Sequence, residues 1–266
     1  QPTTAETASW IMEVGSTPVM IPIGKKGPET KNWSQVKYPS PEVAEAAFSV
    51  PCNVGILLGS EYKIVDIDLD CKEAAAVARY LLPQDTSVFG RESSPRSHYL
   101  YSCEEAGEAI RMKDGAGKIT VELRSQPGGK ACQTVMPGSV HPCGEHIVWW
   151  KTDTPKAIPF DQLSLLIRDT HAASMLLRHY PGEGSRHDYW LAIGGLFAKC
   201  DIPQPRTMAI LEAVFQIAEP DEPWEREDRN KAVATSYSRH ASGQSCKGWS
   251  ALIEYVPDPE LRSLGL

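Results

Sequence analysis

The 266-residue chain lacks several features that would place it in a specialised class of protein. No apolar run is long enough to cross a membrane, and the polar start, QPTTAETASW, contains no hydrophobic signal-peptide segment. The seven cysteines are scattered without CxxC spacing, which is typical of reduced thiols. These absences predict a cytoplasmic protein with no membrane partner. The chain does not begin with Met, so we expect it to be part of a longer polypeptide.

The chain also lacks the basic excess that is common among nucleic-acid-binding domains. It carries 27 Lys and Arg against 34 Asp and Glu, for a net charge of −7. This balance argues against a surface that is basic overall, but it leaves room for a local basic groove. Carboxylates that bind metal ions would add to the negative total. The hydrophobic content of 41% is that of an ordinary globular protein, and no internal repeat is present.

Strand-like segments dominate the first part of the chain. The apolar runs NVGILLG (53–59) and YKIVDIDLD (62–70) are separated by two residues, which predicts an antiparallel hairpin. Further strands are expected at 19–24, 97–101, 118–124, 131–137 and 146–150.

Helical segments are few at first and dominate later. Ser40 as an N-cap, followed by Pro41 at the first helical position, predicts a helix over 40–48. Another helical run, which starts near residue 73, is stopped by Pro83. After about residue 155 the periodicity becomes helical, with core stripes such as Trp190, Ile193 and Phe197. The pattern predicts an α+β domain over residues 1–165 and an all-helical module over 166–266.

Three aspartates stand out within the octapeptide KIVDIDLD. Asp66, Asp68 and Asp70 alternate with apolar residues, so a strand would place all three on one face. Like charges at this spacing repel unless a cation lies between them. We therefore interpret Asp66 and Asp68 as metal ligands, whereas Asp70, at the strand end, is read as a turn or helix-capping residue.

Two later strands carry polar residues that could complete a site. Glu122 lies on the polar face of KITVELR, and His98 follows Ser97 in SPRSHYLY, close to Arg91 and Arg96. Carboxylates with Arg and His side chains are typical of two-metal nucleotidyl transfer, in which Mg²⁺ or Mn²⁺ binds the acids and the cationic residues hold a triphosphate.

The order of these segments resembles the bifunctional primase–polymerase (Prim-Pol) family of the archaeo-eukaryotic primase superfamily. The resemblance rests on VDIDLD, SPRSHYLY, TVELR and VMPGSVHPCG, in that order, and on PIGKKGPETKNW upstream. It implies an RRM-like α+β catalytic domain followed by a small helical bundle. It also implies metal binding by Asp66, Asp68 and Glu122, and phosphate binding by His98. The chain departs from the family in having Ser directly before His, and Glu where several relatives have Asp.

The resemblance also implies partners and a cellular setting. The expected substrates are a single-stranded DNA template and NTPs or dNTPs, and in plasmid and phage replication proteins of this kind a helicase domain often follows on the same polypeptide. The expected location is the cytoplasm of a bacterial, archaeal or phage-infected cell.

Several other residues are candidate ligand contacts. The nucleotide-binding candidates besides His98 are Arg91, Arg96, Ser97, Lys130, Ser139 and His141. The template-binding candidates are Lys26, Lys31, Arg186 and His187. Zinc is not expected, because Cys132, His141, Cys143 and His146 lack the usual ligand spacing.

Two other functions use the same residues. A metal-dependent nuclease or phosphohydrolase would shorten a DNA strand with the same carboxylates. A non-catalytic single-stranded-DNA-binding replication module would bind without forming any product. The order of the motifs favours DNA synthesis over both.

Overall fold

The computed structural model describes residues 1–265, apart from the side chain of Pro127. The chain divides into two compact units, each built from several segments. The first unit contains residues 1–70, 84–111 and 122–164, and the second contains 71–83, 112–121 and 165–266. Residue 165, the expected boundary, is thus one of several points at which the chain passes between units. As expected, the fold is mixed α+β.

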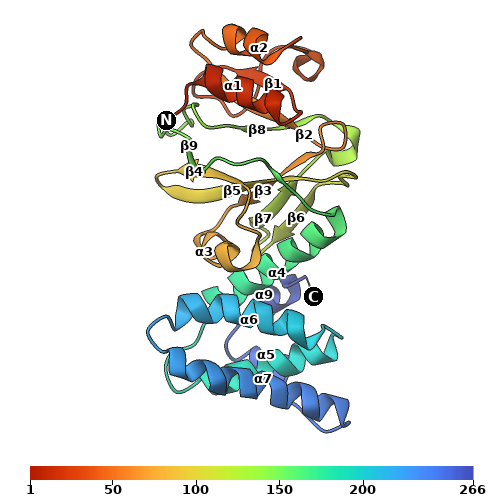
Figure 1. The fold of residues 1–266 in the computed structure, drawn as a ribbon. Helices are drawn as coiled ribbons and strands as arrows, with labels where there is room; N and C mark the ends of the chain where they lie inside the picture. The colour runs from red at the N-terminus through yellow and green to blue at the C-terminus, as the bar shows by residue number, and fades with distance from the viewer. Residues whose placement is uncertain (266) are drawn as a thin grey trace. The chain divides into compact units, whose positions relative to one another are not determined.

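The elements follow one another along the chain as Figure 1 labels them. Up to residue 157 they are α1 (Thr4–Glu13), β1 (Pro18–Ile21), α2 (Pro41–Ala47), β2 (Asn53–Leu58), β3 (Ile64–Leu69), α3 (Lys72–Leu81), β4 (Ser87–Arg91), β5 (Ser94–Ser102), β6 (Ile110–Lys113), β7 (Ile119–Arg124), β8 (Cys132–Val135), β9 (Val148–Lys151) and β10 (Lys156–Ala157), with short 3₁₀ turns at Trp33–Gln35 and Pro127–Gly129. Then come α4 (Phe160–Arg178), α5 (Arg186–Lys199), α6 (Gln204–Ala218), a 3₁₀ turn at Pro223–Glu225, α7 (Arg226–Ala241), α8 (Trp249–Leu252) and α9 (Asp258–Ser263).

The strands form two sheets. The larger has the order β6-β7-β3-β5-β4-β9, with β10 pairing with β5, and the smaller has the order β1-β2-β8. In the larger sheet β3 is antiparallel to β5, and the register places Asp68 opposite His98. Two residues predicted from separate motifs therefore share one face of the sheet.

The predicted hairpin between residues 53–59 and 62–70 is wrong. Strands β2 and β3 belong to different sheets. Between them, the structure has one isolated antiparallel β-bridge, from Gly59 to Ile64, in place of a hairpin. Gly59 and Lys63 both have positive φ, and the chain changes sheet between them. β2 is buried along its whole length because it is the middle strand of the smaller sheet, between β1 and β8. Its continuous apolar character reflects burial on both faces.

Helix positions follow from local signals. Ser40 accepts a hydrogen bond from the Val43 amide and Pro41 begins α2, which confirms the predicted start. The helix predicted to stop at Pro83 is α3. The sequence reasoning missed α1, although its signal is present: Thr3 and Glu6 form a capping box, each side chain accepting from the other's amide. α1 buries Ala8 and Ile11 in the core of the first unit.

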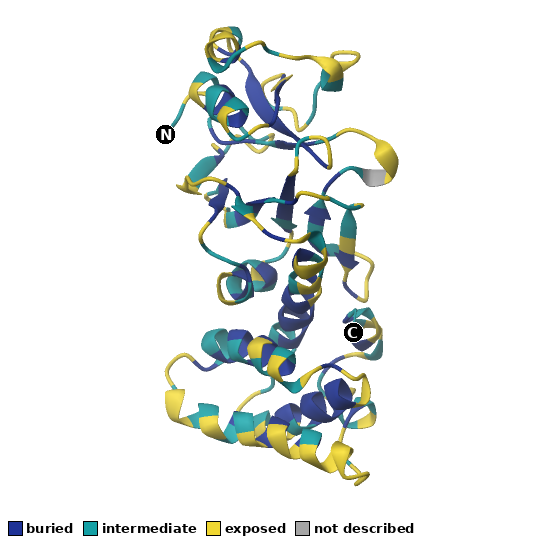
Figure 2. Cartoon of the chain, turned by 45° about the vertical axis from the view of Figure 1, so that its right-hand side comes forward, coloured by how far each residue is buried: buried dark blue, intermediate teal, exposed yellow. Residues whose placement is uncertain are grey.

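The second unit has its own core. Trp190, Ile193 and Phe197 of α5 are fully buried, which confirms the predicted helical stripe. α7 combines buried residues such as Ala232 and Val233 with exposed ones, as an amphipathic helix requires, and Figure 2 shows both kinds of residue on the helices of this unit. Among the described residues, no helix has the length and apolar character needed to cross a membrane.

A test of this packing uses Gly195 in α5. Ala is favoured over Gly in helices by about 1 kcal/mol, but a Cβ at Gly195 would lie 1.9 Å from the backbone oxygen of Lys247. We expect Gly195→Ala to lower the free energy of unfolding by about 2 kcal/mol, measured by urea denaturation. Gly182→Ala is the control, because nothing lies within 4 Å of its added Cβ. Equal stability of the two variants would contradict the packing described.

Candidate active site

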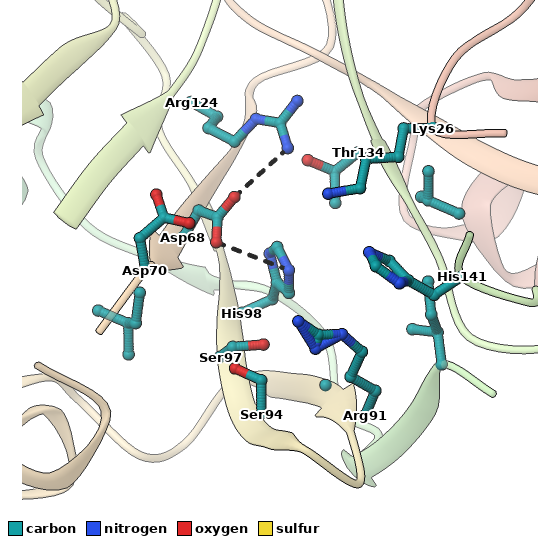
Figure 3. A pocket seen from close by; sticks show the side chains of 14 residues that line it. Lys26, Asp68, Asp70, Arg91, Ser94, Ser97, His98, Arg124, Thr134 and His141 are labelled. Atoms are coloured by element: carbon teal, nitrogen blue, oxygen red, sulfur yellow. Dashed lines mark ion pairs between the residues drawn. The ribbon is translucent and has the colours of Figure 1, made fainter. Parts of the chain in front are cut away.

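The acidic face of β3 forms one wall of a cavity. Asp66 and Asp68 point to the same side of the strand, and Asp70 follows directly after it, before α3. The Asp66 side chain is fully buried, whereas Asp68 keeps 19% of its side-chain surface exposed. Asp68 and Asp70 line the cavity, as Figure 3 shows. The exposure of the three aspartates therefore increases from Asp66, which is enclosed in β3, to Asp70, which lies just after the strand.

His98 lies against two of these carboxylates. Its Nδ1 is 3.0 Å from Asp66 Oδ2, and its Nε2 is 3.7 Å from Asp68 Oδ1. The imidazole stacks on Phe89, with ring centroids 4.7 Å apart. Burial alone would lower the pKa of His98, but the charges of Asp68 and Asp66 outweigh it and raise that pKa to about 9. His98 is therefore an imidazolium at neutral pH.

Further donors come from β7 and β8. Thr134 donates a hydrogen bond of 2.6 Å to Asp66 Oδ2. Arg124 places Nη1 3.6 Å from Asp68 Oδ2 and donates to the backbone oxygen of Gln133. Burial would raise the pKa of Asp66, but His98, Arg124 and Thr134 together lower it. Asp66 is thus a fully compensated buried carboxylate.

The outer carboxylates are less well compensated. Burial, together with the charges of Asp66 and Asp70, outweighs the opposite effect of His98 and Arg124 and raises the pKa of Asp68 to about 6. Burial also raises the pKa of Asp70, and the nearby charge of Glu122 adds to it. Negative charge is therefore in excess at the accessible end of the acidic face.

Glu122 is on the same face of β7 as Arg124, two residues away, and its charge acts on Asp70. Its carboxylate accepts a hydrogen bond of 2.6 Å from Arg111 Nε, and 14% of its side chain is exposed. It lies outside the lining of the cavity. In this arrangement Glu122 is engaged by an arginine.

The opposite wall of the cavity is basic and hydroxylic. Figure 3 shows Lys26, Arg91 and His141 across from Asp68 and Asp70. Ser94 and Ser97 of β5 add hydroxyl groups. Arg91 also lies 3.5 Å from Glu145. One cavity thus brings together an acidic wall and a cationic wall.

The other predicted ligand contacts lie elsewhere. Ser139 is buried and bonds to the backbone of Val54, and Lys31 and Lys130 are exposed. In the second unit, Arg186 pairs with Glu219 and Glu222, and His187 pairs with Asp228. Arg96 points to a separate surface, described below.

Sequence reasoning missed Asp70, Arg124 and Thr134 as site residues. Asp70 continues the alternation of Asp66 and Asp68, and Arg124 follows Glu122 at the same two-residue spacing, so both carried a usable signal. Thr134 carried none, because it comes from the smaller sheet and meets Asp66 only through the tertiary fold.

The donor set fits a hard divalent cation. Asp66, Asp68, Asp70 and Glu122 supply the carboxylate oxygens that Mg²⁺ and Mn²⁺ prefer, and the raised pKa of Asp68 marks uncompensated negative charge there. As the side chains stand, the described residues contain no group of three or more His, Cys, Asp and Glu arranged as a metal site. Salt bridges from Arg124 and Arg111 now engage Asp68 and Glu122.

The His98 pair predicts a pH dependence of stability. Because the folded pKa of about 9 exceeds the ordinary value of 6.5, this pair stabilises the fold fully below pH 6.5 and progressively less as pH rises through 9. In the presence of a chelator that removes metal ions, the free energy of unfolding should fall between pH 6.5 and pH 9. The His98→Gln variant should show a smaller fall over the same range. His187→Gln, at an exposed histidine, is the control. An identical slope in wild type and His98→Gln would refute the assignment.

Comparisons with known proteins address this segment of the chain. The family model of the bifunctional DNA primase/polymerase N-terminal domain matches residues 8–161, more than half of the chain. Searches of the curated proteins and of the solved structures found no match. The matched range contains every residue that lines the cavity described above. The chain therefore belongs to the bifunctional DNA primase/polymerase family.

Proposed function

We propose that the chain is a DNA primase–polymerase that transfers a nucleoside monophosphate from an NTP or dNTP to a 3′-hydroxyl, directed by a DNA template, and releases pyrophosphate. The observation that carries this proposal is the single cavity in which Asp68 and Asp70 face Lys26, Arg91 and His141. A triphosphate needs cationic partners on one side, and catalytic cations need carboxylates on the other.

We assign the carboxylates to Mg²⁺ or Mn²⁺. Asp66, Asp68 and Glu122 are the proposed ligands. We add Asp70 to this set because it lies close to the negative charges of Asp68 and Glu122. Bound cations would lower the pKa of the attacking hydroxyl and stabilise the leaving pyrophosphate. For Glu122 to take part, its salt bridge with Arg111 has to open. Asp66 is buried outside the cavity lining and bonds to His98 and Thr134, so it can bind a cation only if one of these hydrogen bonds gives way.

The remaining residues of the cavity would position the triphosphate. Lys26 and Arg91 neutralise charge on the phosphoryl oxygens, and Ser97 donates a hydroxyl hydrogen bond. The Nδ1–H group of His98 donates a hydrogen bond to Asp66, so Nε2–H is the group that would donate to a phosphate oxygen. Asp66 acts on this step by holding the His98 ring in place and keeping it charged.

Finer features of the family extend the proposal to the rest of the chain. We assign an RRM-like fold to the catalytic domain and a helical bundle to the segment after residue 165, which would support de novo primer synthesis. A helicase domain on the same polypeptide is the proposed partner.

The first test is Asp68→Asn, which keeps the shape of the side chain and removes its charge. We expect it to reduce extension of a labelled, annealed primer at least 100-fold with Mg²⁺ or Mn²⁺ and all nucleotides, with circular dichroism unchanged. Asp85→Asn, at an exposed carboxylate paired with Lys156, should extend normally. A primer shortened by the wild type would assign the site to a nuclease. Binding without any product would reduce the protein to a DNA-binding module.

The second test separates nucleotide from template contacts. Lys26 was predicted to contact the template, but it lines the carboxylate cavity, so the proposal gives it to the triphosphate. We expect Lys26→Gln to raise the nucleotide KM about tenfold and to leave template affinity unchanged. Lys25→Gln is a matched control, because Lys25 is exposed and pairs with Glu29. If Lys26→Gln lowered only the affinity for the template, Lys26 would be assigned to a template contact instead.

A further inference from the structure

A second cavity adjoins the carboxylate cavity in the first unit. It has a volume of about 470 Å³, against about 230 Å³ for the first, and its exposed lining is mostly apolar. The two cavities share Gly90 and Arg91, at the end of β4. The second cavity is also lined by Arg96 and Trp150, neither of which reaches the first. A ligand in one cavity would therefore lie next to a ligand in the other.

A bulge in β5 separates the residues that serve the two cavities. Phe89 pairs with His98 and Arg91 pairs with Ser94, so two steps along β4 match four along β5. Within this bulge Arg96 has a φ of 54°, a conformation that is uncommon for a residue other than glycine. The result is that Ser94 and Ser97 line the carboxylate cavity, while Arg96 lines the second one.

Gly90 allows this bulge to lie close to β4. A Cβ on Gly90 would be 2.4 Å from the backbone oxygen of Ser94 and 2.8 Å from the amide nitrogen of Arg96. The wall that the two cavities share is thus made at this point by backbone.

Arg96 and Trp150 together form a stacking surface. The guanidinium lies over the indole of Trp150, 5.5 Å from the ring centroid, and it donates a hydrogen bond of 2.5 Å to Gln84. Trp150 is 62% exposed, although large aromatic side chains are usually buried. An accessible indole backed by a fixed arginine is suited to stack on a nucleobase.

We propose that Trp150 and Arg96 bind unpaired bases of the single-stranded DNA template beside the catalytic cavity. This inference rests on the proposed function, since it places the template next to the carboxylates. Stacking supplies the affinity, because the charges of the lining nearly balance: Glu92 and Glu145 oppose the two arginines, and Glu145 pairs with Arg91. Stacking is independent of sequence, as a polymerase requires of its template contacts.

The template fits this surface better than the incoming nucleotide does. The exposed lining of the second cavity is mostly apolar and includes the indole of Trp150, which suits an unpaired base better than a triphosphate. Arg96 lies outside the cavity assigned to the triphosphate and is free of any carboxylate partner among the described ion pairs, so it can meet a backbone phosphate of the strand.

The test measures binding of a labelled single-stranded oligonucleotide by fluorescence anisotropy, without nucleotide or metal ions. We expect Trp150→Ala to weaken binding about tenfold and Trp150→Phe to restore most of the affinity. Arg96→Gln should weaken binding and make its salt dependence shallower. Trp224→Ala, at another exposed tryptophan (69%), is the matched control and should bind normally. Thermal melting checks that each variant folds.

The outcomes separate this inference from the proposed function. Wild-type oligonucleotide affinity in Trp150→Ala overturns the inference, and extension by the wild type would still uphold the function. An unchanged oligonucleotide affinity with weaker nucleotide binding also overturns it and assigns the surface to the incoming base. Weaker oligonucleotide binding supports the inference even if the wild type extends no primer, in which case the proposed nucleotidyl transfer alone fails.

Discussion

The buried carboxylate of Asp66 is the interaction on which the rest of the site depends. It lies in the larger sheet, yet it accepts a hydrogen bond from Thr134 of the smaller sheet and another from His98 of the neighbouring strand. Arg124 makes a parallel link, from Asp68 to the backbone of Gln133. A buried charge is costly unless hydrogen bonds and opposite charges surround it. The need to satisfy the Asp66 carboxylate therefore fixes the distance between the sheets, the orientation of the imidazole and the position of the acidic strand.

Local patterns predicted the elements better than their partners. The alternation of Asp66 and Asp68 identified the acidic face, and Ser40 with Pro41 identified the start of α2, because each signal lies within a few residues. The assignment of β2 and β3 to separate sheets was not predictable in this way. It depends on positive φ values at Gly59 and Lys63 and on β2 finding its partners in β1 and β8, which are distant in the sequence.

The same distinction applies to the site. Asp66 and Asp68 come from one strand and follow the strand period, so the sequence could identify them, whereas Glu122 comes from β7 and was identified only by the order of the motifs. The basic wall combines Lys26, Arg91 and His141 from three separate segments, and only the fold shows that they share a cavity. Arg96 and Arg91 looked equivalent in the sequence. The β5 bulge sends them to different surroundings, and no periodicity rule describes a bulge in advance.

The backbone wall at Gly90 has a consequence for how such an enzyme can change over time. The side chains around the two cavities come almost entirely from different residues, and what lies between them at Gly90 is peptide rather than side chain. Apart from Arg91, whose side chain lines both cavities, substitutions in one lining therefore leave the other lining intact. Related proteins could change their choice of nucleotide without weakening their binding of DNA, or the reverse, provided that Gly90 and Arg91 are kept.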